Sequence, residues 1–153
     1  MNLSQHFTLA EFTASDTAER QRIDNTLPDE LLPEAMATAQ MMERIRHQLS
    51  FLKMQEVPII STSGYRCLAL NTAIGSKPTS DHIRALAWDF RATTFGAPID
   101  ICRALVPCMD ALGIGQLIYE HTWVHVSRRR QDKPFNKVLT VQGTGYTVGI
   151  VEA

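Results

Sequence analysis

The sequence predicts an α+β fold, in which a small antiparallel sheet is flanked by helices. Residues 28–52 repeat apolar side chains at helical spacing. Two β-forming runs, 116–120 and 123–128, are separated by only two residues, the spacing of a tight hairpin. A second ribbon is predicted over 137–142 and 146–151, turning through Gly143-Thr144-Gly145. A succession of helices followed by hairpins is typical of an antiparallel sheet with helices on one side.

The first 27 residues are predicted to form an N-terminal arm that packs on the rest of the chain through Phe7, Leu9 and Phe12. The helix over 28–52 follows it. Pro28 suits a first helical turn, and the acidic Asp29 and Glu30 favour the positive end of the helix dipole. The apolar stripe that should face the core comprises Leu31, Ala35, Ala39, Met42, Ile45 and Leu49.

The middle of the chain alternates strands with a long polar segment. Residues 57–63 are β-branched and end at Gly64, which predicts a strand. Residues 64–85 are rich in Gly, Ser, Pro and Asn, and form a loop long enough to indicate function. A second strand is predicted over 87–92. Residues 98–112 are predicted to be helical, with Pro98 in the first turn and Pro107 splitting the helix.

Composition sets limits on the class of protein. The chain has 153 residues, of which 44% are apolar and 20% charged, so we expect one domain over 1–153. Fifteen basic and 16 acidic residues give a net charge of -1, which argues against a strongly basic nucleic-acid binder. Residues 128–130 are three consecutive arginines, either a solvated turn or a contact for an anionic polymer. Three cysteines without a CxxC spacing argue against a disulfide framework or a thiolate metal cluster.

The start of the sequence lacks the basic region and apolar run of a secretory signal, and no run of 18 apolar residues occurs. We therefore expect a protein made in the cytoplasm without a signal peptide or a membrane anchor.

Three residues form a candidate metal-binding set. His82 lies in the polar loop, Asp89 lies inside an apolar strand seven residues later, and His125 lies in another β-forming run. A carboxylate buried in a strand costs several kcal/mol unless it is paired or bound to a cation. Two imidazoles and one carboxylate match a catalytic zinc site that leaves a fourth position for water. Taken singly, each residue also fits a structural role, as a hydrogen-bonded core histidine or a carboxylate paired with arginine.

Three ordered segments resemble the zinc DD-peptidases of the peptidase M15 family. They are SGYRCLALN at 63–71, SDHIRALAWDF at 80–90 and WVHVS at 123–127. This family comprises metallo D-Ala-D-Ala carboxypeptidases and L-Ala-D-Glu endopeptidases of peptidoglycan, including phage endolysins. The N-terminal HFTLAEFTASDTA resembles the opening of the short phage and prophage branch. The resemblance implies a hedgehog/DD-peptidase-like fold whose antiparallel sheet carries the zinc site at one face.

The resemblance also implies roles for individual residues. It makes His82, Asp89 and His125 the ligands of one zinc ion per chain. It assigns Arg66 to contact with the substrate and stabilisation of the developing oxyanion, and Ser80 to holding the substrate.

The sequence departs from the family pattern at two positions. Ala85 stands where the family motif has glycine, so a positive φ there would strain the backbone. Several branches place an acidic catalytic base three residues before the last ligand, where this chain has Thr122.

Hairpin geometry instead indicates Glu120 as the catalytic base. If His121 and Thr122 form a two-residue turn, Ile118 pairs with His125, and Glu120 lies on the same face as His125. The two Cα atoms would then be roughly 7 Å apart, which allows the carboxylate to reach the attacking water. The alternative is that Glu120 is an exposed hairpin acid.

The expected function is zinc-dependent hydrolysis of an amide bond in the stem peptide or cross-link of peptidoglycan, as by a phage or prophage endolysin that acts on the wall after release. Two alternatives stay open: a D-Ala-D-Ala carboxypeptidase, and a catalytically inactive zinc-bound module that binds the wall or serves as a phage structural protein. We expect a monomer whose partner is a peptidoglycan peptide, without nucleic acid or a membrane anchor.

Overall fold

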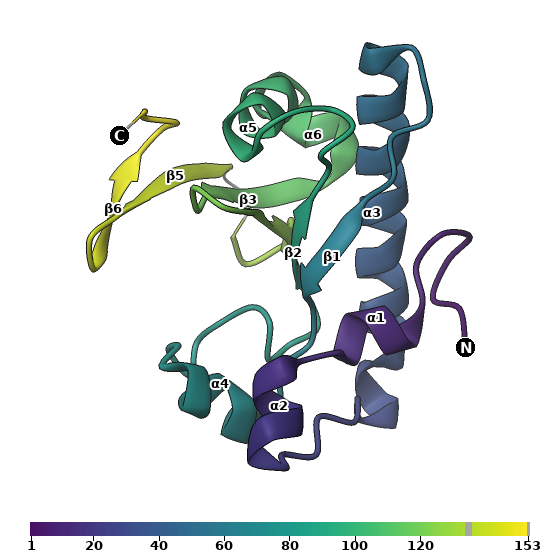
Figure 1. Cartoon of the computed structure of the whole chain (residues 1–153), viewed down its shortest axis with the longest axis vertical. Coiled ribbons are helices and arrows are strands. Elements are labelled where there is room, and N and C mark those ends of the chain that lie inside the picture. The colour runs from purple at the N-terminus through teal and green to yellow at the C-terminus, as the bar shows by residue number, and fades with distance from the viewer. Residues whose placement is uncertain (134–135, 153) are drawn as a thin grey trace.

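The computed structural model describes residues 1–133 and 136–152, and it confirms the α+β fold. One six-stranded sheet has the strand order β1-β2-β4-β3-β5-β6. The long helix α3 (Leu32–Lys53) runs beside this sheet, and α5 and α6 lie near it on the same side (Figure 1). The N-terminal helix α2 (Asp16–Gln21) lies beside α4 (Leu68–Ile74) below the sheet, and α1 (Leu9–Thr13) lies beside β1 (Figure 1).

The N-terminal arm contains two short helices that were not predicted, α1 (Leu9–Thr13) and α2 (Asp16–Gln21). Each is capped by a hydroxyl side chain, that of Thr8 for α1 and that of Ser15 for α2. Phe7 and Phe12 are buried as predicted. Their ring centroids lie 5.2 Å and 4.6 Å from that of Trp88, respectively, so the arm contributes to the same core cluster as the sheet.

The predicted first helix begins four residues later than expected. Pro28 precedes a 3-10 turn, η1 (Asp29–Leu31), and Pro33 instead takes the first turn of α3. Proline is tolerated there because the first helical N–H groups have no partner within the helix. The buried side of α3 contains the predicted stripe from Ala35 to Leu49, together with Thr38 and Met41.

Two strands and an unpredicted helix follow. Strand β1 (Ile60–Ser63) pairs antiparallel with β2 (Ala87–Arg91). Between them, α4 (Leu68–Ile74) lies within the segment predicted to be a loop. It is short, and it is closed by Gly75 in the left-handed conformation at φ +84°. Gly75 therefore marks the end of a helix in this segment, as glycine commonly does.

The proline-split helix is confirmed. α5 (Pro98–Leu105) is followed by the 3-10 turn η2 (Val106–Cys108), which contains Pro107, and then by α6 (Met109–Leu112). The hairpin that follows consists of β3 (Ile114–Tyr119) and β4 (Val124–Arg128). Its register pairs Ile118 with His125, as the two-residue turn predicted.

The expectation of a wholly antiparallel sheet is corrected at one pair. β5 (Lys137–Gln142) pairs parallel with β3 and antiparallel with β6 (Gly145–Val148). β4 and β5 flank β3 on its two edges. Because the chain reverses direction between β4 and β5, β5 runs antiparallel to β4 and therefore parallel to β3.

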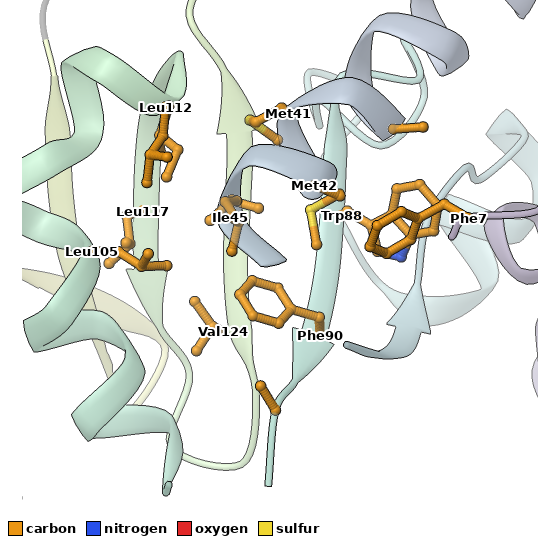
Figure 2. Close-up of a cluster of buried hydrophobic side chains, with 14 of the residues drawn as sticks. Phe7, Met41, Met42, Ile45, Trp88, Phe90, Leu105, Leu112, Leu117 and Val124 are labelled. Atoms are coloured by element: carbon orange, nitrogen blue, oxygen red, sulfur yellow. The ribbon is translucent and has the colours of Figure 1, made fainter. Parts of the chain in front are cut away.

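The two faces of the sheet differ in chemistry. One face packs beneath α3 and presents Phe90, Val124 and Leu117, which interleave with Met42 and Ile45 of the helix (Figure 2). Alternation along the strands turns Asp89 and His125 to the other face. All three cysteines are free, and no helix among the described residues has the length and apolar character to cross a membrane.

Candidate metal centre and active site

The site is built on a row of side chains that crosses the sheet. Ser63 of β1 pairs with Asp89 of β2, Asp89 pairs with His125 of β4, and His125 pairs with Ile118 of β3. Directly paired residues present their side chains on the same face. The register therefore brings Asp89 and His125 together, although 36 residues separate them in sequence.

His82 joins this row from the loop before β2. Its Nδ1 lies 2.6 Å from the carbonyl oxygen of Gly64, and its Nε2 lies 3.3 Å from Oδ1 of Asp89. The side chain is almost completely buried, at 3% exposure. The tight turn that follows His82 sets this orientation, because the N–H of Ala85 donates to the His82 carbonyl at 3.3 Å.

The hydrogen bonding of His82 suits a residue that binds a cation. A carbonyl oxygen only accepts, so Nδ1 of His82 must donate its proton to Gly64. Burial lowers the pKa of His82, which favours the neutral imidazole with a lone pair on Nε2. That lone pair faces Oδ1 of Asp89, which is also an acceptor. Two buried acceptors that face each other are stabilised by a cation between them.

His125 completes the group from the opposite strand. Its Nδ1 lies 2.8 Å from Oδ1 of Asp89, and its Nε2 lies 2.9 Å from Oγ of Ser127. Burial opposes protonation, but the hydrogen bond and charge of Asp89 outweigh it and raise the pKa of His125. Although burial also opposes ionisation of Asp89, the two histidines hold the pKa of its carboxyl well below its usual range.

The donor set fits a divalent metal ion. One ligand atom from each of His82, Asp89 and His125 lies within 4.8 Å of the other two. Tetrahedral zinc with bonds of about 2.1 Å holds its ligand atoms roughly 3.4 Å apart. Here Oδ1 of Asp89 lies 3.3 Å from Nε2 of His82 and 2.8 Å from Nδ1 of His125. Each histidine also has a hydrogen-bond partner on its other nitrogen, the usual arrangement for a metal-binding imidazole.

Arg66 and Ser80 both lie beside this group. Nη2 of Arg66 is 3.2 Å from Oδ2 of Asp89, and its Nε donates to Oγ of Ser63 at 3.1 Å. The guanidinium is therefore held against the oxygen that faces away from the histidines. Ser80 Oγ accepts from the backbone N–H of His82 at 3.3 Å, so Ser80 supports the ligand loop.

Glu120 lies at the end of the hairpin on the face of His125. Its backbone N–H donates to the Trp123 carbonyl at 3.2 Å, and its Oε2 accepts from the indole Nε1 of Trp123 at 2.6 Å. Burial, and to a smaller degree the charge of Asp89, raise the pKa of the Glu120 carboxyl. The carboxyl is thus half-buried near the group of His82, Asp89 and His125, and its pKa is raised.

Ala85 has the backbone conformation that its place in the motif suggested. Its φ is +59°, and the residue is fully buried. The Thr38 hydroxyl of α3 donates to its carbonyl at 2.7 Å, which fixes the turn against the helix. A residue with a Cβ therefore occupies a position where glycine has no steric penalty.

Three supporting groups were not among the residues selected from the sequence: the Gly64 carbonyl, Ser127 and Trp123. Ser127 lies two residues after His125, so strand alternation alone places it on the site face. Trp123 is adjacent to Glu120 through the turn pairing. The Gly64 carbonyl is a backbone group in a long segment, and no residue pattern identifies it.

A family model described as Peptidase M15 matches residues 5–127, from the N-terminal arm to the end of the WVHVS segment. Among curated proteins, none matches the chain in sequence. The matched region contains His82, Asp89 and His125, as well as Arg66 and Glu120.

Proposed function

Because the chain belongs to the peptidase M15 family, we propose that it is a zinc-dependent peptidase that hydrolyses an amide bond in the stem peptide or cross-link of peptidoglycan. The observation that carries the proposal is the buried group of His82, Asp89 and His125, with the lone pair of His82 directed at a carboxylate oxygen. We propose one zinc ion per chain at these three residues.

A bound zinc ion would supply Lewis acidity, which polarises a carbonyl group and lowers the pKa of water to about 7. Glu120 is the proposed general base, which takes a proton from the attacking water and returns it to the leaving amine. Its position supports this role, because the charges of Asp89 and His125 both act on its carboxyl. The Trp123 indole orients the carboxyl through its hydrogen bond to Oε2.

Arg66 is the proposed group that stabilises negative charge on the scissile carbonyl oxygen. Its side chain is only 12% exposed, and hydrogen bonds to Ser63 and Asp89 fix the orientation of the guanidinium before substrate arrives. A preorganised donor of this kind contributes about 3 kcal/mol to transition-state stabilisation. Ser80 is proposed to hold the substrate from the loop that carries His82.

The biological setting proposed is that of a phage or prophage endolysin, which rests on the resemblance of the N-terminal segment to that branch. A D-Ala-D-Ala carboxypeptidase would use the same residues. The inactive zinc-bound module is the less favoured alternative, because both Arg66 and an acid at Glu120 lie at the site.

Mass spectrometry of purified muropeptides incubated with the protein tests the proposal. New fragments should form, should not form when a chelator is present from the start, and should form again when zinc is added back. The masses identify the bond, since loss of a terminal D-Ala marks a carboxypeptidase and separation of L-Ala from D-Glu marks an endopeptidase. Intact muropeptides with a zinc-loaded protein would support the inactive module instead.

A further inference from the structure

A cavity of about 440 Å³ lies next to the candidate metal centre. Three of its lining residues form one row across the sheet, in which Ser127 of β4 pairs with Gln116 of β3, and Gln116 pairs with Lys137 of β5. This row is adjacent to the row of His125, because Ser127 follows His125 by two residues. Two residues of a strand span roughly 7 Å. The row of Ser127, Gln116 and Lys137 is therefore one side-chain row away from the metal ligands, on the same face.

The cavity and the metal centre share a wall. Ser127, which is buried, lies in the lining and contacts Nε2 of His125 through its Oγ at 2.9 Å. Asp81, also in the lining, directly precedes His82. A molecule whose scissile bond lies at the metal centre would thus extend into this cavity on one side.

The charge of the lining favours an anion. Four basic residues and two acidic ones contribute to it. Both acids already pair with Arg130. Its Nη1 lies 3.3 Å from Oδ1 of Asp81, and its Nε and Nη2 donate to the two carboxylate oxygens of Asp132. None of the ion pairs between described residues involves Lys133 or Lys137. The two ammonium groups are therefore the cations of this cavity that an incoming anion can pair with.

Most of this charged lining lies outside the region shared with the family. The family match ends at residue 127, whereas the basic residues of the cavity lie between 128 and 137. Lys137 reaches the cavity because β5 pairs parallel with β3, beside the hairpin that carries His125 (Figure 1). The C-terminal ribbon thus adds a charged wall to the matched site.

We propose that this cavity binds the free α-carboxylate of the substrate residue whose amine leaves, with Lys133 and Lys137 as the binding groups. The inference rests on the proposed function. In D-Ala-D-Ala the leaving residue carries the terminal carboxylate. In L-Ala-D-Glu the D-Glu continues the stem through its side-chain carboxyl, so its α-carboxylate is free as well. Either way the carboxylate oxygens lie within roughly 5 Å of the reacting carbonyl carbon, since only the amide N and one Cα intervene.

Paired ligands test the inference. L-Ala-D-Glu and D-Ala-D-Ala, each with its α-carboxylate free or amidated, are titrated calorimetrically into zinc-loaded Glu120→Gln protein, in which turnover should be about a hundredfold slower. The free acid of at least one dipeptide should bind about tenfold or more tightly than its amide, the range for a charge-assisted hydrogen bond. The double substitution Lys133→Met with Lys137→Met should abolish that preference. Lys53→Met with Lys77→Met, a matched change at two exposed lysines outside the cavity lining, should retain it.

Three results would overturn the inference: equal binding of acid and amide, a preference that survives the cavity substitutions, or no binding of either dipeptide. Muropeptide cleavage measured in parallel separates this from the proposed function. Wild-type protein that binds the acids selectively but releases no fragments contradicts the function alone. Protein that cleaves muropeptides at the same rate with and without the two lysines contradicts the carboxylate site alone.

Discussion

Adjacent residues of β2 belong to two faces of one sheet with opposite roles. Phe90 points into the apolar core under α3, and Asp89 points to the face that carries the histidines. Both residues are at least 97% buried, so they are buried to nearly the same extent, but the energetic consequences differ. Burial of the phenyl ring stabilises the fold, whereas burial of the carboxylate costs free energy that its partners offset.

The difference shows how the chain separates stability from chemistry. The core face holds the sheet rigidly against Met42 and Ile45, and that rigidity fixes the distances on the other face (Figure 2). The site face then brings together the polar groups of His82, Asp89 and His125. If this division is correct, substitutions on the two faces should affect different measurements.

The largest expected effect is on the site face. Asp89→Asn removes the anionic ligand and should reduce peptide hydrolysis by about ten-thousandfold or more, because both carbonyl polarisation and water activation depend on the metal. Zinc content should fall below a tenth of an equivalent by elemental analysis, while far-UV circular dichroism stays unchanged. Full zinc occupancy in this variant would remove Asp89 from the ligand set.

The matched substitution on the core face is Phe90→Ala. Removal of a fully buried ring should lower the free energy of unfolding by about 3–5 kcal/mol, measured by urea denaturation. Zinc bound per folded chain should remain near one equivalent. A variant that loses zinc while it remains folded would show that the two faces are not independent.

A smaller effect is expected at Glu120. Glu120→Gln should keep zinc and reduce turnover by about a hundredfold, because the attacking water loses its proton acceptor. In the wild type, burial raises the pKa of this carboxyl, so the acidic limb of the pH–rate profile should lie above the ordinary glutamate value of 4.5. A base must be ionised to act, and activity is therefore lost as the pH falls through that raised pKa.

Trp123→Phe provides the matched control for the Glu120 assignment. The indole hydrogen bond stabilises the ionised carboxylate and lowers its pKa, in opposition to burial. Its removal should shift the acidic limb to still higher pH and leave the plateau rate nearly unchanged. An unshifted limb would mean that another group sets it.

The sequence predicted those features that depend on local periodicity. The stripe of α3, the helix split at Pro107 and the hairpin register between Ile118 and His125 all follow from spacing within about 15 residues. The motif resemblance selected His82, Asp89 and His125, and the fold brings them together.

Features that depend on distant parts of the chain were not predictable in this way. The parallel pairing of β5 with β3 depends on which edge of the sheet β5 joins. The alternation of side chains within 137–142 is the same for either strand direction, so it does not predict the pairing. The helix α4 has only seven residues in a segment of turn formers, too short for its apolar period to stand out. The cavity lined by Lys133 and Lys137 exists only because that strand pairing brings 137 beside Gln116.

The smallest expected effect concerns the backbone that connects the two faces. Ala85 has a φ of +59° in the turn between His82 and β2, and such a conformation costs a non-glycine residue about 1–2 kcal/mol. Ala85→Gly removes that strain, but it also loses a buried methyl worth about 0.8 kcal/mol and adds about 0.5–1 kcal/mol of backbone entropy cost. The three terms nearly cancel, so the free energy of unfolding should stay within about 1 kcal/mol of wild type.

Ala87→Gly isolates the strain. Ala87 is equally buried but lies in the extended strand β2, so the same substitution there loses the methyl and the entropy with no strain to relieve. It should cost about 1.3–1.8 kcal/mol in urea denaturation. The difference between the two glycine variants measures the strain at Ala85, and equal losses at both positions would show that there is none. Because Ala85 accepts the Thr38 hydroxyl of the core helix and donates to the carbonyl of His82, a measured strain would lie directly between the stabilising face and a metal ligand.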